Sequence, residues 1–390
     1  MNCIQTHHVN DNVSYSCFST SNGCEELYLT IRTTQGCDIA TALDALSADY
    51  EVAICAANLK DTTTVFSRLF LSDMINQKEI IETSPLMKQL RHGALSLIEQ
   101  KPVGGGPISL FSYHVRGVDT KSKYNSGSYK NTSTCKGNHY SLLYTANFSD
   151  ETSFDVSLQT STIFNELSGI FETNGIKLLD NTIRTWIYVH DVDNHYMGMV
   201  RARKEFFTEH GLTNQTRYLA STGIDGGCES PGRLVCIDSL SIGGLIPEQI
   251  IRMEAPTHLS PTIMYGVTFE RGLRVKFGDR SHLYISGTAS IDNKGNVLFI
   301  GDIVNQTRQT VENLIALLDQ QQSTIADLAY LIVYVRNFHE WGLAHNILRE
   351  KLGHKLPIIS VEAKVCRPTW LIELEGVAVM NDKNDFPPYL

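Results

Sequence analysis

The sequence lacks the paired cysteines and histidines that hold metal ions in proteins. Its 390 residues include 13 histidines and nine cysteines, yet they contain no C-x-x-C, H-x-x-x-H or H-E-x-x-H motif. The cysteines are odd in number and scattered: Cys3, Cys17, Cys24, Cys37, Cys55, Cys135, Cys228, Cys236 and Cys366. A structural zinc site or a disulfide framework needs closer, paired spacing. We therefore expect reduced thiols and no bound metal.

Long apolar runs and an excess of basic charge are missing as well. No apolar run approaches the roughly 20 residues that span a bilayer, and residues 1–5 lack the basic-then-apolar pattern of a signal peptide. The formal net charge is -9, which disfavours binding to the phosphates of nucleic acids. The sequence thus predicts a cytoplasmic protein that binds neither membranes nor nucleic acid. An anionic substrate would have to be captured by clustered arginines.

What is present is the composition of a globular protein, with 42% hydrophobic and 19% charged residues. In the last third, residues 283–291 read as a strand and 292–296 as a turn. Val311, Leu314, Ile315 and Leu318 lie at helical spacing within 307–320. A strand at 328–335, a helix at 341–352 and strands at 358–365 and 370–380 follow. The order predicted is β-α-β-α-β-β.

The same pattern recurs twice upstream. The middle third shows strands at 140–146, 183–189, 218–222 and 233–242 around helices at 160–173 and 196–210. The first third retains only the strands at 64–73 and 107–115 clearly. We predict three tandem repeats, 1–120, 121–247 and 248–390, of which the first is divergent. Polar linkers are expected near 118–135 and 243–261.

The third repeat resembles the Rid/YjgF family. The resemblance rests on Ser286-Gly287, the helix entry at 306–313 (QTRQTVEN), and the segments 361–368 (VEAKVCRP) and 372–379 (IELEGVAV). It implies an α/β (α+β), chorismate mutase-like fold. Because Rid proteins are homotrimers with ligand sites between subunits, three fused copies imply an internal pseudo-trimer. The chain would then be a monomer or a small homo-oligomer.

A narrower resemblance, to chorismatases, covers roughly residues 138–380. Its blocks are 217–224 (RYLASTGI), 265–272 (YGVTFERG), 278–280 (GDR), 286–292 (SGTASID) and 366–370 (CRPTW). It implies a cofactor-free enzyme for secondary metabolism that splits chorismate into pyruvate and a cyclic carboxylic acid. We favour 3-hydroxybenzoate as the product, with 4-hydroxybenzoate and a dihydroxycyclohexadiene carboxylate left open.

Glu373 is the candidate proton donor. Strand alternation puts it on one face with Glu375 and apolar residues, and burial beside a second carboxylate would raise its pKa. From the residues alone, the interpretation of both glutamates as solvated strand residues is the favoured one. The resemblance places an essential glutamate here.

The remaining candidates surround the substrate. Arg367 matches the arginine that holds the substrate carboxylate in Rid proteins, through two parallel hydrogen bonds. Cys366 is the second catalytic candidate, because in the family a cysteine here accompanies release of 3-hydroxybenzoate. Further substrate-binding candidates are Arg217, Tyr218, Tyr265, Arg271, Gly287 and Thr288, with Arg280 also considered. We expect only two or three of the arginines and tyrosines in this second group to touch the ligand.

Two other functions fit the same residues. A Rid-type imine deaminase would use Arg367 and Glu373 on a smaller imino acid, without a second cationic clamp. A non-catalytic small-molecule-binding protein would tolerate Glu373→Gln.

Overall fold

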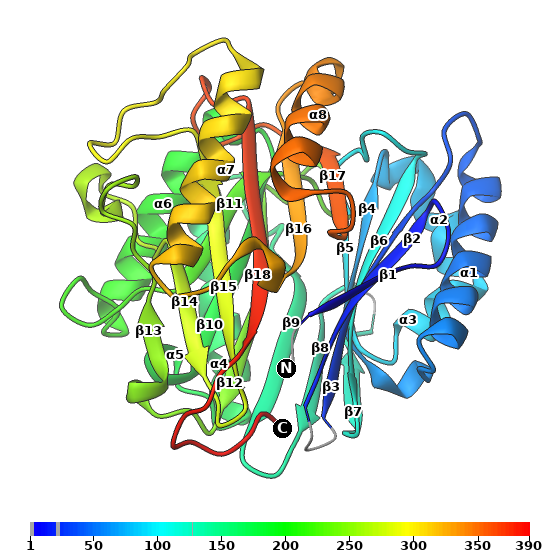
Figure 1. The fold of residues 1–390 in the computed structure, drawn as a ribbon, viewed down its shortest axis with the longest axis horizontal. Helices are drawn as coiled ribbons and strands as arrows, with labels where there is room; N and C mark the ends of the chain where they lie inside the picture. Colours follow the sequence, from blue (N-terminus) through cyan, green and yellow to red (C-terminus); the bar gives the residue numbers. More distant parts are fainter. Residues whose placement is uncertain (1–3, 21–23, 127) are drawn as a thin grey trace.

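The protein is built from three β-sheets of the same topology, with helices packed on their outer faces (Figure 1). The computed structural model describes residues 4–20, 24–126 and 128–390. Each sheet has six strands, and their spatial order is the same when the strands of each sheet are numbered along the chain: first, second, third, sixth, fourth, fifth. The fourth and fifth strands are parallel, and the other pairs are antiparallel.

The first sheet has the order β1-β2-β3-β6-β4-β5. Its strands are β1 (Gln5–His8), β2 (Val13–Ser19), β3 (Glu25–Arg32), β4 (Thr64–Leu71), β5 (Ala94–Glu99) and β6 (Ile108–Arg116). Its helices are α1 (Ile39–Ala56), α2 (Met74–Thr83) and α3 (Pro85–Leu90).

The second sheet repeats this order as β7-β8-β9-β12-β10-β11. Its strands are β7 (Thr120–Tyr124), β8 (Asn131–Lys136), β9 (Ser141–Ser149), β10 (Thr182–Val189), β11 (Ala220–Asp225) and β12 (Val235–Gly243). Its helices are α4 (Val156–Thr173), α5 (Leu178–Asn181) and α6 (Val192–Glu209).

The third sheet has the order β13-β14-β15-β18-β16-β17. Its strands are β13 (Ile250–Arg252), β14 (Gly272–Lys276), β15 (Arg280–Ala289), β16 (Leu328–Val335), β17 (Ile358–Glu362) and β18 (Ile372–Asn381). Its helices are α7 (Ile303–Asp319) and α8 (Trp341–Leu352). Short 3-10 turns include η3 (Thr262–Tyr265) and η5 (Phe338–Glu340).

The predicted β-α-β-α-β-β unit is confirmed three times, and each copy is preceded by two further strands. The predicted linker at 118–135 is wrong, since β7 and β8 form an antiparallel hairpin at the edge of the second sheet. The side chains of β7 are exposed or half-exposed, so the sequence of this edge strand reads as a polar linker. The second predicted linker, 243–261, likewise contains β13.

The three sheets contact one another in a cycle. The fifth strand of each sheet contacts the third strand of the next: β5 contacts β9, β11 contacts β15 and β17 contacts β3. Aromatic side chains from all three sheets meet at the centre: Tyr28, Phe66, Phe111, Tyr113, Tyr144, Trp186, Tyr284 and Tyr330. The described residues therefore form an internal pseudo-trimer.

A buried ion pair joins the sheets at each of the three interfaces. Arg68 contacts Asp238 at 2.9 Å, Arg184 contacts Glu375 at 2.6 Å, and Arg280 contacts Glu26 at 2.6 Å. A buried charge is tolerated only where a partner of opposite charge compensates for lost hydration. Arg280, considered above as a substrate ligand, is thus committed to an interface with the first sheet, because its side chain is fully buried against Glu26 and Asp279.

A β-bulge distinguishes two of the sheets from the first. In the second sheet, two residues of β9, Ala146 and Asn147, lie opposite the single residue Asp238 of β12. In the third sheet, Ser286 and Gly287 of β15 lie opposite Glu375 of β18 in the same way. The pairing of β3 with β6 is regular. A bulge places an extra residue in one strand and redirects the side chains around it.

No helix among the described residues is both long enough and apolar enough to cross a membrane. Within the same residues, no group of three or more His, Cys, Asp or Glu side chains is arranged to hold a metal ion.

Candidate functional site

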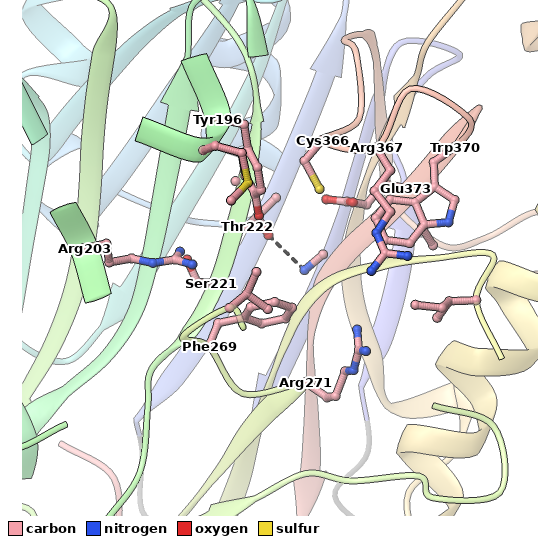
Figure 2. A pocket seen from close by; sticks show the side chains of 16 residues that line it. Tyr196, Arg203, Ser221, Thr222, Phe269, Arg271, Cys366, Arg367, Trp370 and Glu373 are labelled. Carbon is pink, nitrogen blue, oxygen red and sulfur yellow. Dashed lines mark hydrogen bonds between the residues drawn. The ribbon is translucent and has the colours of Figure 1, made fainter. Parts of the chain in front are cut away.

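A cavity of about 160 Å³ lies at the interface between the second and third sheets (Figure 2). Helix α6 and strand β11 form its wall on the second repeat, and β15, β18 and the β17–β18 loop form its wall on the third. Its polar and charged lining residues are Tyr196, Arg203, Ser221, Thr222, Arg271, Cys366, Arg367 and Glu373. The apolar lining includes Val267, Phe269, Ala289, Ile291 and Trp370.

Glu373 reaches this cavity from β18 with 5% of its surface exposed. Burial, and secondarily the charge of Glu375, raises the pKa of its carboxyl from 4.5 to about 8, although Arg184 and Arg271 act in the opposite direction. Glu375 has its own partners: Arg184 donates to it at 2.6 Å and the Trp186 indole at 2.9 Å. Glu375 is therefore held in an ion pair with Arg184, while Glu373 remains a carboxylic acid near neutral pH.

The close approach of β15 to Glu373 requires glycine at position 287. A Cβ atom there would lie 2.2 Å from Oε1 of Glu373. The Gly287 backbone N–H donates to Oγ1 of Thr222 at 3.0 Å (Figure 2), and Thr222 also accepts from Arg184 at 2.7 Å. The bulge thus places bare backbone beside the carboxyl and ties it to the second repeat.

Cys366 lies next to Glu373, with its sulfur facing the carboxyl (Figure 2). Burial and the neighbouring Glu373 raise the pKa of this thiol to about 12. Cys366 is therefore a neutral thiol at physiological pH, unlike a nucleophilic cysteine, which is activated by a lowered pKa. The Tyr196 side chain interacts with it from α6, and burial raises the pKa of this phenol too.

Three guanidinium groups line the cavity from different sides (Figure 2). Arg367 donates to the Gly295 carbonyl at 2.9 Å and stacks over Trp370. Arg271 is anchored by two hydrogen bonds to the Ser260 carbonyl. The Arg203 Nε donates to Thr268 at 3.1 Å, and its Nη2 is a buried donor without a hydrogen-bond partner within the described chain.

Among the described residues, Arg203 forms no ion pair with a carboxylate. Burial lowers its pKa, an effect that the nearby Tyr196 and Cys366 oppose. A buried, unsatisfied cationic donor is costly unless a ligand completes it. This geometry fits an anionic group bound within reach of Arg203.

Several predicted binding residues lie outside the cavity. The Arg217 guanidinium donates to the backbone carbonyls of Leu179 and Thr182, so its donors hold the second repeat together. Tyr218 lines a separate hollow beside Glu270, and the Thr288 hydroxyl donates to the Ser286 carbonyl within β15. These three residues therefore lie apart from the other candidates, and their part in substrate binding stays a prediction.

Tyr265 ends η3, and its side chain lies outside the described part of the structure. Of the other predicted residues, Glu373, Cys366, Arg367, Arg271 and Gly287 come together in the cavity. Sequence reasoning missed Arg203, Tyr196 and Thr222. Thr222 lies within a block that was recognised, whereas Arg203 and Tyr196 belong to α6, where nothing in the sequence marks them.

The corresponding position between the first and second sheets is closed. Asn147 occupies the bulge position of Gly287, and its side chain bonds both to the N–H of Leu97 at 2.9 Å and to its carbonyl at 3.0 Å. Cys236 occupies the register position of Glu373. Among the described residues, the interface of the first and second repeats therefore has neither the acid nor the space beside it.

Comparison with known proteins identifies relatives of the third repeat and of the whole architecture. The family model described as Endoribonuclease L-PSP matches residues 275–380. A RutC family protein of Pyrococcus horikoshii is 31% identical over 97 residues, which are 25% of this chain and 77% of that protein. A RutC family protein of Pyrococcus abyssi is 26% identical over 97 residues, 25% of this chain and 76% of its own.

The crystal structure of a chorismatase shares the fold over nearly the full length. It superposes with a TM-score of 0.64 at 16% sequence identity, covering 90% of this chain and 98% of that one. The resemblance of the two folds thus extends over the three-sheet arrangement and is not confined to the third repeat.

Proposed function

We propose that this chain, which belongs to the RutC family, cleaves chorismate into pyruvate and a cyclic carboxylic acid, with 3-hydroxybenzoate as the favoured product. One observation carries the proposal: a buried carboxylic acid, Glu373, faces a cavity lined by three guanidinium groups. Cleavage of chorismate requires a proton donor for its acid-sensitive enol ether and cationic groups that bind its two carboxylates. The likeness in fold to a chorismatase supports the same assignment.

The arginines supply substrate binding. Chorismate carries two carboxylates, and a guanidinium can hold each through parallel charge-assisted hydrogen bonds. Arg367 and Arg203 enter the cavity from the third and the second repeat respectively, while Arg271 contributes from the segment before β14. The chain as a whole is acidic, with a net charge of -9, so this local concentration of positive charge is what draws the dianion in.

Glu373 is assigned as the general acid. With a pKa of about 8, it is mostly protonated at pH 7, which a donor to carbon needs. Proton transfer to the methylene carbon of the enol ether leaves an oxocarbenium-like centre. The bond between the ring carbon and the ether oxygen then breaks, its electrons complete the carbonyl of pyruvate, and the ring is left electron-poor.

The fate of the ring decides the product. Attack by the neighbouring ring hydroxyl on the cationic carbon forms a protonated epoxide, and the bond between this oxygen and its original ring carbon then opens. Loss of a ring proton back to the Glu373 carboxylate restores aromaticity and yields 3-hydroxybenzoate without net water. Attack by water yields the dihydroxycyclohexadiene carboxylate. The neutral Cys366 thiol lies beside Glu373 and leaves less room there for an attacking water, which favours the first outcome.

The test is a product assay. Purified protein is incubated with chorismate in EDTA, pyruvate is followed with a coupled enzyme, and the cyclic product is identified by chromatography. We expect pyruvate with 3-hydroxybenzoate, loss of both in Glu373→Gln, and unchanged rates in Glu312→Gln, which replaces an exposed glutamate of α7. Cys366→Ala should divert product toward the diol. No pyruvate above the uncatalysed background would refute the proposal.

A Rid-type imine deaminase is the second candidate, because the family model matches residues 275–380, which include Arg367 and Glu373. Such an enzyme needs one carboxylate clamp, whereas this cavity presents three arginines. Ammonia release from a freshly generated imino acid, with no pyruvate from chorismate, would favour this function. Ligand binding without turnover of either substrate, unaffected by Glu373→Gln, would instead indicate a non-catalytic binding protein.

A further inference from the structure

A second and larger cavity, of about 480 Å³, lies at the interface between the first and third sheets. It is bounded by α8 and β17 of the third repeat and by β1, β2 and β3 of the first. In Figure 1, α8 and β17 are drawn in orange beside the blue strands of the first sheet. We call this space the 1/3 groove.

The 1/3 groove is the pseudo-symmetric counterpart of the candidate site. Strand β17 contacts β3 as β11 contacts β15. Ser360 in the groove pairs with Val333 of β16, and Gly223 in the candidate site pairs with Ile187 of β10. Val333 and Ile187 hold the same position in their strands, so Ser360 and Gly223 are equivalent residues. The interface of the first and third sheets therefore has a ligand-sized cavity at the position equivalent to the candidate site.

One cationic residue recurs at both sites. Arg203 lies 14 residues after Val189, the last residue of β10, and Arg349 lies 14 residues after Val335, the last residue of β16. Both arginines line their cavities from the helix that follows the strand. The third repeat has thus kept the helix-borne cation at its interface with the first.

The 1/3 groove carries more basic than acidic groups in an acidic protein. Arg32, Arg349, Lys355 and three histidines line it, and among the described residues Asp11 is its one carboxylate. Arg32 donates to the Asp11 carbonyl at 3.2 Å and Arg349 to the His354 carbonyl at 2.7 Å. In the described ranges neither guanidinium forms an ion pair with a carboxylate. Burial and the neighbouring Arg349 lower the pKa of Arg32, and the charge of Asp11 acts in the opposite direction.

The groove lacks the acid of the candidate site. In the register of the first sheet, Ser109 of β6 takes the place of Glu373. The surface that remains combines two guanidinium groups with the Trp341 indole, whose ring lies 5.0 Å from that of His345. Guanidinium groups hold a carboxylate and an indole face packs against a ring.

We propose that the 1/3 groove is a second, non-catalytic binding site for a small organic anion that carries a carboxylate on a ring. This inference does not depend on the reaction at the candidate site. Arg32 and Arg349 bind the carboxylate, and Trp341 packs against the ring.

The three tryptophans of the chain allow a site-resolved test, because Trp341 lines the groove, Trp370 the candidate site and Trp186 the central core. The full-length protein is labelled with 5-fluorotryptophan, the three fluorine resonances are assigned with Trp→Phe variants, and benzoate is titrated. We expect a saturable shift of the Trp341 resonance. Binding should weaken about tenfold in Arg32→Gln and in Arg349→Gln, since each removes a charge-assisted contact.

Arg201→Gln, which removes an exposed arginine of α6, is the matched control and should leave the titration unchanged. The Trp186 resonance reports in every variant whether the core remains folded. A benzoate shift confined to Trp370, or a Trp341 shift that persists in both groove variants, would overturn the proposal. An equal response of Trp341 to inorganic phosphate would overturn the assignment to a ring carboxylate.

Discussion

Replacing Glu373 with glutamine should make the protein inactive and, above mildly acidic pH, more stable. The carboxyl is buried and its pKa is raised from 4.5 to about 8. In the unfolded chain the group ionises near its ordinary pKa, while the folded protein holds the proton until about pH 8. The unfolded state then binds fewer protons, so the free energy of unfolding falls as pH rises between these two values.

The size of this effect follows from the shift. One pKa unit corresponds to about 1.4 kcal/mol, and between about pH 5 and about pH 8 the wild-type protein should lose about 3 kcal/mol of stability through this group. The amide of Glu373→Gln has nearly the same shape and does not titrate. The difference in unfolding free energy between Glu373→Gln and the wild type should therefore change with pH. It should be about 3 kcal/mol more in favour of the variant at pH 8 than at pH 5.

Urea unfolding of both proteins at the two pH values measures this difference, and all other titrating groups cancel in the comparison. The slopes of the unfolding transitions must agree for the comparison to hold. The activity of the wild type should fall along the same titration, as pH rises through about 8. A stability difference that is the same at both pH values would show that Glu373 ionises normally, and the general-acid role would fall with it.

Three further substitutions probe the surroundings of Glu373. Gly287→Ala places a Cβ against the Glu373 carboxyl and should lower kcat about 100-fold in the pyruvate assay; an unimpaired rate would contradict the close packing. Glu375→Gln leaves Arg184 buried without its anionic partner, which should cost about 3 kcal/mol in urea unfolding. Removing this negative charge should also lower the pKa of Glu373 and shift the alkaline limb of the activity profile to lower pH. Arg203→Gln should raise KM for chorismate about tenfold with little change in kcat, and a KM equal to the wild type would exclude it as a substrate clamp.

The sequence was sufficient for elements whose pattern is local. Strand β16 occupies the predicted residues Leu328–Val335, because a short apolar, β-branched run is an unambiguous signal. The two opening strands of each sheet escaped notice. Strand β13 has three residues and β7 faces solvent, so neither shows the alternation of a half-buried strand.

The candidate site was predictable where one segment supplies several of its residues. Cys366, Arg367 and Glu373 lie within eight positions of the chain, and the family resemblance marks all three. The sequence could not show which of Arg203 and Arg217 lines the site and which has a structural role. Both are buried arginines of the second repeat, and only the tertiary fold shows that Arg217 bonds to backbone carbonyls while Arg203 faces the cavity.

The difference between Gly287 and Asn147 at equivalent bulges also bears on how such a protein diverges. In a homotrimer encoded by one short gene, a substitution appears at all three interfaces at once, so no interface can be sealed without sealing the others. Joining the copies in one chain gives each bulge its own codon. Here one codon leaves room beside an acid and the other fills the space with an amide, so each interface is free to acquire, lose or change a ligand under separate selection.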